Sequence, residues 1–364
     1  MYSFPRLSAL SRSSVQCFSS SIANVQLGEP GNIRWTQYVN RPLEFAPEDT
    51  TIVLFPGQGA QFPGMGKQLF AIPKVKEMFQ CANDTLRTDL LNICLEGPSS
   101  KLNQTVHCQP ATFVVSLAAM VKLQEENDEL VRNCVATAGF SLGEITALVF
   151  AGALTFEQGL YLVRVRAEAM QRACAESRGG MLTVFLTHES QLNLAISAAI
   201  NHCKNMLHMP DPLCRVANYL YTDCKVVSGH IEAIEFLEKH HAQFNIRKCH
   251  RLPVSGAFHT ELMEPAVRPV LRALARMGEV KTPTIPVISA LDVLPYASAE
   301  SVKRKLSFQI KRPVRWEQLL HAMYSRPPDA SFPHTLEPGP GRQLGLMLRM
   351  VNRKAFERYR SIEV

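Results

Sequence analysis

The pentapeptide Gly-Phe-Ser-Leu-Gly at residues 139–143 constrains the fold of this chain more than any other feature of its sequence. Residues 134–140 are an apolar run that predicts a buried strand, and the apolar spacing of residues 142–151 predicts a helix. A Gly-x-Ser-x-Gly turn that joins a strand to a helix is a nucleophile elbow, in which the glycines avoid collisions with neighbouring backbone. Ser141 would stand at the helix N-terminus, where backbone N–H groups favour negative charge. A structural serine in a glycine turn stays an alternative, since five-residue patterns recur by chance.

The elements around this turn indicate an α/β protein. A continuous apolar run at residues 51–55 predicts a second buried strand, and it leads directly into a glycine-rich turn at residues 56–61. Apolar spacing predicts helices at residues 110–125 and 156–176. Because 364 residues exceed what one small core fills, we expect one large domain with an insertion, or two domains.

Residues 181–252 are predicted to have a different order of strands and helices. Their order, β-α-β-β-α-β, is the ferredoxin-like split unit, which we interpret as a small subdomain inserted into the larger one. Its expected strands are residues 181–186, 214–219, 224–228 and 246–252, with helices at 189–203 and 231–241. After it we expect a helix at 261–277, a strand at 285–289, helices near 299–310 and 315–324, and a terminal loop at 337–341.

The first 28 residues differ in composition from the rest of the chain. They contain two arginines and eight serines, and the first acidic residue is Glu29. An Arg-containing, Ser-rich leader without acids is typical of an organelle transit peptide. A disordered tail is the alternative.

The remaining composition excludes several classes of protein. No run approaches the ~20 predominantly apolar residues that a membrane-spanning helix needs. The ten cysteines form no C-x-x-C pair and no set with metal-ligand spacing, so we expect buried free thiols and no metal. The formal net charge of +7 suits an acidic partner or a phosphorylated substrate. Because the basic residues are dispersed, we do not expect a nucleic-acid-binding protein.

A serine nucleophile needs a base at neutral pH, and His259 is the best candidate among eleven histidines. It lies where a predicted strand ends, just before a helix. By itself, such a histidine is more often a structural residue with satisfied hydrogen bonds. No Asp or Glu stands out in the sequence as a third member of a triad.

Two further features fit a site for acyl chemistry. The backbone N–H of Gln58, in the glycine-rich turn, and that of Leu142 could form an oxyanion hole, although the turn could also be only structural. Arg166 lies among apolar residues of a predicted helix, and Arg164 would point to another face. A buried arginine requires an anionic partner, either a substrate carboxylate or an internal glutamate.

Taken together, the chain from about residue 51 to its end resembles the malonyl-CoA:acyl carrier protein transacylases. Seven blocks carry this resemblance in order: LFPGQGAQFPGMG (54–66), VHCQPATF (106–113), GFSLGEITALVFAGAL (139–154), RAEAMQ (166–171), LPVSGAFHTELMEPA (252–266), FQIKRPVRW (308–316) and EPGPGRQLG (337–345).

The resemblance implies a role for each candidate residue. Ser141 would take the acyl group, and His259 would act as general base and then as general acid. A main-chain carbonyl at Gln309 would hold the histidine in place of an acid. Arg166 would bind the free carboxylate of malonate. The amides of Gln58 and Leu142 would form the oxyanion hole.

The same resemblance implies a fold and a substrate preference. The fold would be an α/β-hydrolase-like large subdomain, residues 51–180 and 253–364, with the ferredoxin-like insert at 181–252. Bulk at Phe258 would disfavour a methyl-branched substrate, although one methyl discriminates by only ~1–3 kcal/mol. Many relatives have His at the position of Phe140 and Asn at that of Ala290; the first departure touches no assigned role and the second weakens inference about its loop.

The implied partners are malonyl-CoA and phosphopantetheinylated acyl carrier protein, with no cofactor, in the mitochondrial matrix. We expect a monomer. Lys311, Arg312 and Arg315 are candidates for docking the acidic carrier protein, and a solvated charged face is the alternative. A serine hydrolase or thioesterase of related fold, or a non-catalytic scaffold, are the competing functions. A scaffold would be expected to lose Ser141, His259 or Arg166, and all three are present.

Overall fold

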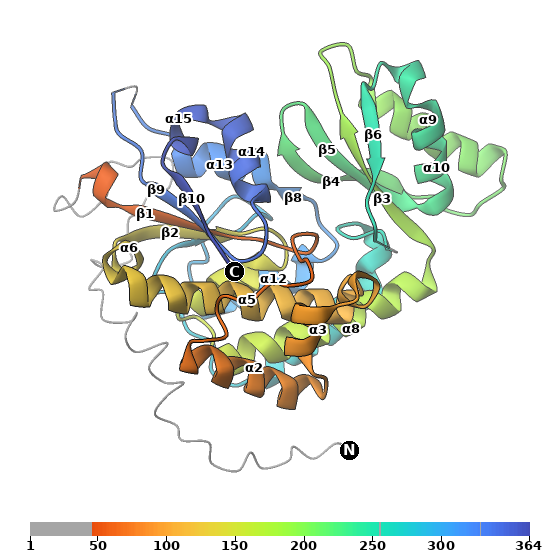
Figure 1. The fold of residues 1–364 in the computed structure, drawn as a ribbon. Helices are drawn as coiled ribbons and strands as arrows, with labels where there is room; N and C mark the ends of the chain where they lie inside the picture. The colour runs from red at the N-terminus through yellow and green to blue at the C-terminus, as the bar shows by residue number, and fades with distance from the viewer. Residues whose placement is uncertain (1–45, 255, 328) are drawn as a thin grey trace.

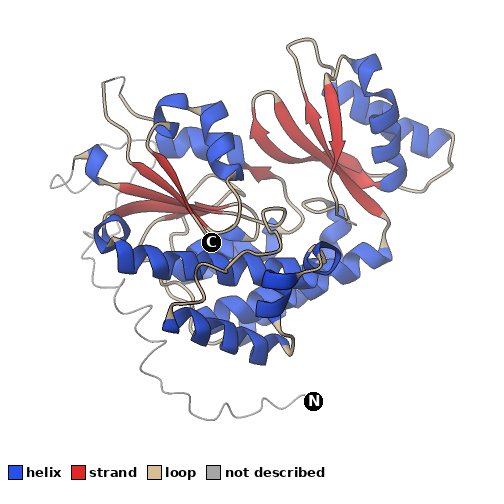
Figure 2. Ribbon diagram, viewed as in Figure 1, coloured by secondary structure: helices blue, strands red, loops and turns tan. Residues whose placement is uncertain are grey.

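The computed structural model describes residues 46–254, 256–327 and 329–364. The predicted transit peptide at residues 1–28 lies outside the described residues. Two five-stranded sheets organise the described chain, as Figures 1 and 2 show, with helices packed against each. The α/β class predicted from the sequence is confirmed.

One sheet, which lies in the larger part of the fold and is called the large sheet below, is parallel and has the strand order β10-β9-β1-β2-β7. Its strands on either side of β1 and β2 are β10 (Tyr359–Ile362), β9 (His334–Pro338) and β7 (Val287–Ile288). Its central strand β1 (Thr51–Phe55) is buried along its whole length, as its continuous apolar run predicts. In the pairing of β1 with β2 (Cys134–Gly139), Phe55 lies opposite Gly139. The two strands therefore end level, and the turns that follow them meet at one edge of the sheet.

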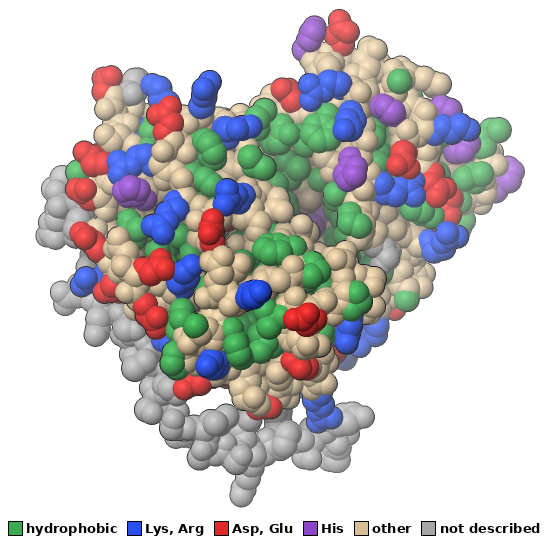
Figure 3. All heavy atoms as spheres, viewed as in Figure 1, with side chains coloured by type: hydrophobic (Ala, Val, Ile, Leu, Met, Phe, Trp, Pro, Cys, Tyr) green, Lys and Arg blue, Asp and Glu red, His purple; other side chains and the backbone are tan. Residues whose placement is uncertain are grey.

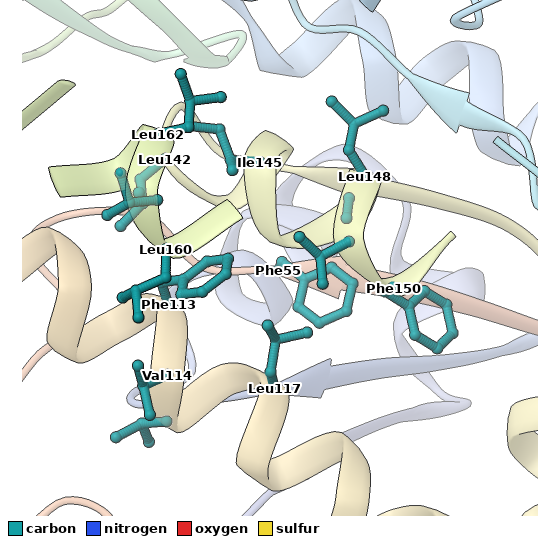
Figure 4. Packing of buried hydrophobic residues seen from close by; sticks show 14 of the residues in the cluster. Phe55, Phe113, Val114, Leu117, Leu142, Ile145, Leu148, Phe150, Leu160 and Leu162 are labelled. Atoms are coloured by element: carbon teal, nitrogen blue, oxygen red, sulfur yellow. The ribbon is translucent and has the colours of Figure 1, made fainter. Parts of the chain in front are cut away.

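Helices cover both faces of this sheet. Val53 and Phe55 of β1 pack into a core with α5 (Thr105–Glu126), α7 (Gly143–Phe150) and α8 (Phe156–Glu176), part of which is drawn in Figure 4. Ile52 and Leu54 point the other way, into a core with α13 (Trp316–Tyr324) and α14 (Gln343–Val351). This alternation makes three layers around β1, because successive side chains of a strand point to opposite faces.

Helix α5 is largely buried. Within the described residues it is the one helix long and apolar enough to cross a membrane by length and composition. However, 83% of its apolar window is buried inside the protein. The structure therefore accounts for its apolar character by core packing.

The other sheet, which lies in the smaller part of the fold and is called the small sheet below, has the order β6-β3-β5-β4-β8. The strands β3 (Gly179–Phe185), β4 (Cys214–Tyr221), β5 (Cys224–His230) and β6 (Lys248–Arg251) pair antiparallel, and α9 and α10 pack on them. The predicted β-α-β-β-α-β unit is confirmed. Its fifth strand, β8 (Val314–Arg315), was not predicted; it pairs parallel to β4 although it belongs to the C-terminal part of the chain.

Several boundaries differ from those expected. The expected terminal loop at 337–341 begins inside a strand, β9 (His334–Pro338), and the strand expected at 285–289 is only β7 (Val287–Ile288). Short edge strands and capping turns leave too little periodicity for prediction. The remaining elements are η2 (Pro47–Asp49), α2 (Pro73–Leu86), α3 (Leu90–Glu96), α4 (Ser99–Leu102), α6 (Asp128–Arg132), α9 (Leu192–Asn205), α10 (Ile231–His240), η3 (His241–Phe244), η4 (Glu261–Met263), α11 (Glu264–Arg276), α12 (Ala299–Gln309), α15 (Arg353–Phe356) and β10 (Tyr359–Ile362).

Candidate active site

Ser141 occupies the sharp turn between β2 and α7. Its φ of 54° lies in the left-handed region, which few residues other than glycine adopt. A Cβ atom on Gly139 would overlap the backbone of Gly143, and one on Gly143 would overlap the carbonyl oxygen of Phe55. The two glycines are thus required by the close approach of three backbone segments. The turn has the geometry of the nucleophile elbow that the sequence pattern predicts.

His259 lies against Ser141, with Nε2 2.8 Å from the serine Oγ. Its Nδ1 lies 3.0 Å from the carbonyl oxygen of Gln309 and 3.1 Å from that of Arg312. Both carbonyls can only accept, so Nδ1 carries the proton and Nε2 is free to accept from the serine hydroxyl. The second carbonyl, at Arg312, had no signal in the sequence.

The environment of His259 keeps it neutral. Burial, and secondarily the charge of Arg166, lower its pKa to about 4, against the opposing effect of the two carbonyl hydrogen bonds. The imidazole is therefore unprotonated at neutral pH, as a general base must be. An anion bound at Arg166 would offset the positive charge and raise the pKa of His259 toward the working range of a base.

Arg166 reaches the same point from α8 and is 2% exposed. Its Nη1 donates to Gln109 Oε1 over 2.8 Å, and its Nη2 donates to Ser141 Oγ over 2.9 Å. Among the described residues, no carboxylate lies within ion-pair distance of it. Burial lowers the pKa of Arg166 to about 10, and Glu144 opposes this. A buried guanidinium held by neutral groups favours an anionic ligand, so the internal-glutamate alternative is disfavoured.

The two amides expected to form an oxyanion hole are those of Gln58, in the turn after β1, and of Leu142, directly after Ser141. Within the described part of the chain, neither the Gln58 nor the Leu142 backbone N–H donates to a protein acceptor. The side chain of Gln58 accepts from Gln109 Nε2 over 3.3 Å. Gln109, which is fully buried, thereby connects this turn to Arg166. It was missed in the sequence, where the only signal was an amide within an apolar helix.

Gln309 and Glu144 complete the polar cluster. Gln309 Nε2 donates to the carbonyl oxygen of Ser141 over 2.9 Å and to Glu144 Oε2, and its Oε1 lies 3.4 Å from Arg166 Nη2. Glu144 is fully buried and also accepts from Tyr296 Oη over 2.5 Å. Burial raises the pKa of Glu144. Glu144 was also missed, although a glutamate in the apolar run that follows Gly143 was a signal.

The remaining candidates lie around this cluster. Phe258 is buried in the larger core, next in sequence to His259. Phe140 packs edge-on against Trp316, with ring centroids 5.3 Å apart. Lys311 forms an ion pair with Glu264, whereas Arg312 and Arg315 are exposed.

The described residues contain no group of three potential metal ligands. The space-filling view in Figure 3 shows a hollow between the part that holds the small sheet and the rest of the molecule, and positive and negative side chains are interspersed over that face.

The sequence of this chain is similar to those of known acyltransferases. Residues 52–332 match the family model described as the acyl transferase domain. The mitochondrial malonyl-CoA–acyl carrier protein transacylase of Homo sapiens is 47% identical over 318 residues, which cover 87% of this chain and 81% of that protein. The malonyl CoA–acyl carrier protein transacylase of Bacillus subtilis strain 168 is 33% identical over 303 residues, covering 83% and 90%.

Solved structures show the same likeness. The malonyl CoA–acyl carrier protein transacylase of Coxiella burnetii has a TM-score of 0.76 and 29% identity, covering 87% of this chain and 95% of that one. A malonyl transacylase in complex with a type II polyketide acyl carrier protein has a TM-score of 0.74 and 29% identity, covering 86% and 96%.

Proposed function

This chain belongs to the acyl transferase family, and on that premise we propose that it carries a malonyl group from malonyl-CoA to acyl carrier protein on Ser141. The reaction is malonyl transfer between two thiols, in mitochondrial fatty acid synthesis. The observation that carries the assignment of the residues is the meeting of Ser141 Oγ with His259 Nε2 and Arg166 Nη2, at 2.8 and 2.9 Å.

The first half of the reaction acylates the serine. His259 Nε2 takes the hydroxyl proton as Ser141 Oγ attacks the thioester carbonyl of malonyl-CoA. The C–S bond then breaks, and the CoA sulfur leaves with the proton that His259 returns. The N–H groups of Gln58 and Leu142 stabilise the oxyanion, each contributing ~2.7–4 kcal/mol in comparable sites.

The second half reverses these steps with a new thiol. The phosphopantetheine thiol of acyl carrier protein gives its proton to His259, attacks the ester of Ser141 and leaves as the malonyl thioester, while the serine regains its proton. Arg166 holds the free carboxylate of malonate through both halves and keeps the carbonyl aligned for attack. Phe258, beside the base, would disfavour a methyl branch.

Two features of the partners are also proposed. Arg312 and Arg315 are exposed near the cluster and suit an acidic carrier protein; Lys311 contributes less, since Glu264 already neutralises it. We propose that the chain acts as a monomer.

Intact-protein mass spectrometry after brief exposure to malonyl-CoA tests the proposal. We expect one malonyl adduct that maps to Ser141, persists in water and disappears when phosphopantetheinylated acyl carrier protein is added. The Ser141→Ala variant should form none. An adduct that water removes as fast as carrier protein does would instead indicate a hydrolase, and an adduct at another residue would overturn the assignment.

A further inference from the structure

We propose that Glu144 is a positioning residue for this reaction, which fixes the orientation of the Gln309 amide and through it the guanidinium of Arg166. The inference rests on the proposed function of Ser141 and Arg166. The observation behind it is a buried row of hydrogen bonds that runs from Tyr296 through Glu144 and Gln309 to Arg166.

The row begins at a carboxylate that is fixed on all sides. Glu144 is fully buried on the first turn of α7, three residues after Ser141. Tyr296 Oη donates to its Oε1 over 2.5 Å, Gln309 Nε2 donates to its Oε2, and Ser289 also hydrogen-bonds to it. Such a side chain has little freedom, so its oxygens present a fixed acceptor to Gln309.

The amide of Gln309 has two orientations that differ by a flip, and its neighbours distinguish them. In the observed orientation, the NH2 group faces two acceptors, Glu144 Oε2 and the carbonyl oxygen of Ser141. The amide oxygen then faces Arg166 Nη2, at 3.4 Å. After a flip, oxygen would face oxygen on one side and N–H would face N–H on the other. Glu144, together with the carbonyl of Ser141, therefore selects the orientation that suits Arg166.

This orientation affects Arg166 more than it affects the base. The Gln309 group that holds His259 is the main-chain carbonyl, which does not move when the side-chain amide flips. The amide oxygen, by contrast, is one of the three acceptors that hold Arg166. Loss of Glu144 should thus weaken recognition of the malonyl carboxylate and leave proton transfer at Ser141 largely intact.

A second explanation for Glu144 has to be separated from this one. Its negative charge also acts on Arg166 across the cluster and raises the arginine pKa. A glutamine at position 144 removes that charge but keeps an acceptor for Gln309, because its own NH2 can donate to the Tyr296 hydroxyl. Glu144→Gln therefore preserves the orientation and deletes the charge.

The experiment compares malonyl-CoA with acetyl-CoA as acyl donors in the full-length enzyme. For each variant, the second-order rate of Ser141 adduct formation is measured with both donors and expressed as a malonyl-to-acetyl ratio. We expect Glu144→Met, which has similar volume but no acceptor, to lower this ratio about tenfold, the size of one oriented hydrogen bond. Glu144→Gln should stay within about threefold of the wild type.

A double mutant shows whether Glu144 acts through Gln309. Gln309→Ala should itself lower the ratio about tenfold, and adding Glu144→Met should lower it little further, because the two residues form one unit. If Glu144→Met folds poorly, Glu144→Leu, which also lacks an acceptor, takes its place, and Gln309→Ala still tests the contact of Gln309 with Arg166. A Gln309→Ala ratio equal to that of the wild type would overturn the proposal.

Glu337→Gln supplies the matched control. Glu337 is also a fully buried glutamate that accepts from a tyrosine, and its hydrogen bonds to described residues go to Leu344, Gly345 and Tyr359, outside the cluster. We expect its ratio to equal that of the wild type. Three other results would contradict the proposal: equal losses with both donors in Glu144→Met, a loss in Glu144→Gln as large as that in Glu144→Met, or additive losses in the double mutant. Failure of the wild type to form a Ser141 adduct would instead count against the proposed function.

Discussion

Two buried glutamates lie at the same edge of the large sheet and differ in what they do. Glu144, just after β2, and Glu337, at the end of β9, are both fully buried. Each accepts from a tyrosine hydroxyl, Tyr296 at 2.5 Å and Tyr359 at 2.6 Å. Burial raises the pKa of both, that of Glu337 to about 7. By burial and titration alone, the two sites would look alike.

Their remaining partners separate them. Glu337 accepts from the backbone N–H groups of Leu344 and Gly345, at 3.1 and 2.8 Å, and so caps the start of α14. Glu144 accepts from Gln309, which in turn contacts Ser141 and Arg166. A raised pKa therefore shows only that a carboxyl group is buried. The hydrogen-bond partners of the carboxyl group show whether it caps a helix or contacts residues of the active site.

The largest expected effect in this contrast comes from replacing Ser141, which lies three residues before Glu144. Ser141→Ala should lower malonyl transfer by at least about 10⁴-fold, because the covalent route is lost. Thermal melting should show little change, because only one hydroxyl is removed. A fully active Ser141→Ala enzyme would remove the contrast, because Glu144 would then not lie beside the nucleophile.

Arg166 gives the next largest effect. Arg166→Ala should reduce kcat/KM for malonyl-CoA by about 10²–10³-fold, because the carboxylate then enters a buried site without its charge partner. Acylation by acetyl-CoA, which has no carboxylate, should fall much less. Parallel assays with both donors check this. Losses of the same size for both would show that Arg166 supports the structure and does not recognise the substrate.

For the second glutamate, Glu337→Ala should lower the free energy of unfolding and leave the acylation of Ser141 unchanged. Its removal leaves two backbone N–H groups and the Tyr359 hydroxyl without an acceptor, for a loss of roughly 3 kcal/mol in the free energy of unfolding. Denaturant unfolding measures the loss, and the Ser141 adduct per folded molecule measures the chemistry. A specific loss of adduct at unchanged stability would erase the distinction between the two glutamates.

The smallest expected effect is on the pH dependence of kcat/KM for malonyl-CoA. Because the pKa of His259 in the free enzyme is about 4, kcat/KM for malonyl-CoA should stay flat as the pH falls from 8 to about 5 and decline only below that. Arg166→Gln should move the decline to higher pH, since the positive charge that lowers the histidine pKa is gone. Brief assays in a buffer series would show it. A wild-type decline centred near 6.5 would mean that burial does not act on this histidine as described.

The parts of this arrangement that could be predicted are those with a local pattern. The elbow at Ser141 is visible because glycine spacing, an apolar strand and a helix coincide, and the roles of His259 and Arg166 followed from family resemblance. Gln109 and Tyr296 have no such pattern; each is one polar residue in an apolar neighbourhood. Their partners are 57 and 152 residues away in sequence, so only the fold brings them together.

The same reason explains the missed strand β8. Two residues carry no periodicity, and Val314 and Arg315 become a strand only because Asn218 and Tyr219 of β4 lie beside them. Likewise, the carbonyl of Arg312 was unpredictable, because any backbone carbonyl has the same chemistry and only the position of His259 selects this one.

Strand β8 also has a mechanical consequence. It begins two residues after Arg312, whose carbonyl, with that of Gln309, holds the imidazole of His259. In the described part of the chain, the pairing of β8 with β4 is one of several connections between the small sheet and the rest of the molecule. The others include the chain's entry from α8, its exit toward His259 and the ion pair of Lys225 with Glu317. If the small sheet tilts to admit a bulky thioester, the segment from Gln309 to Arg315 must tilt with it or release the pairing. Opening of the hollow is therefore coupled to the hydrogen bonds that hold the imidazole of His259.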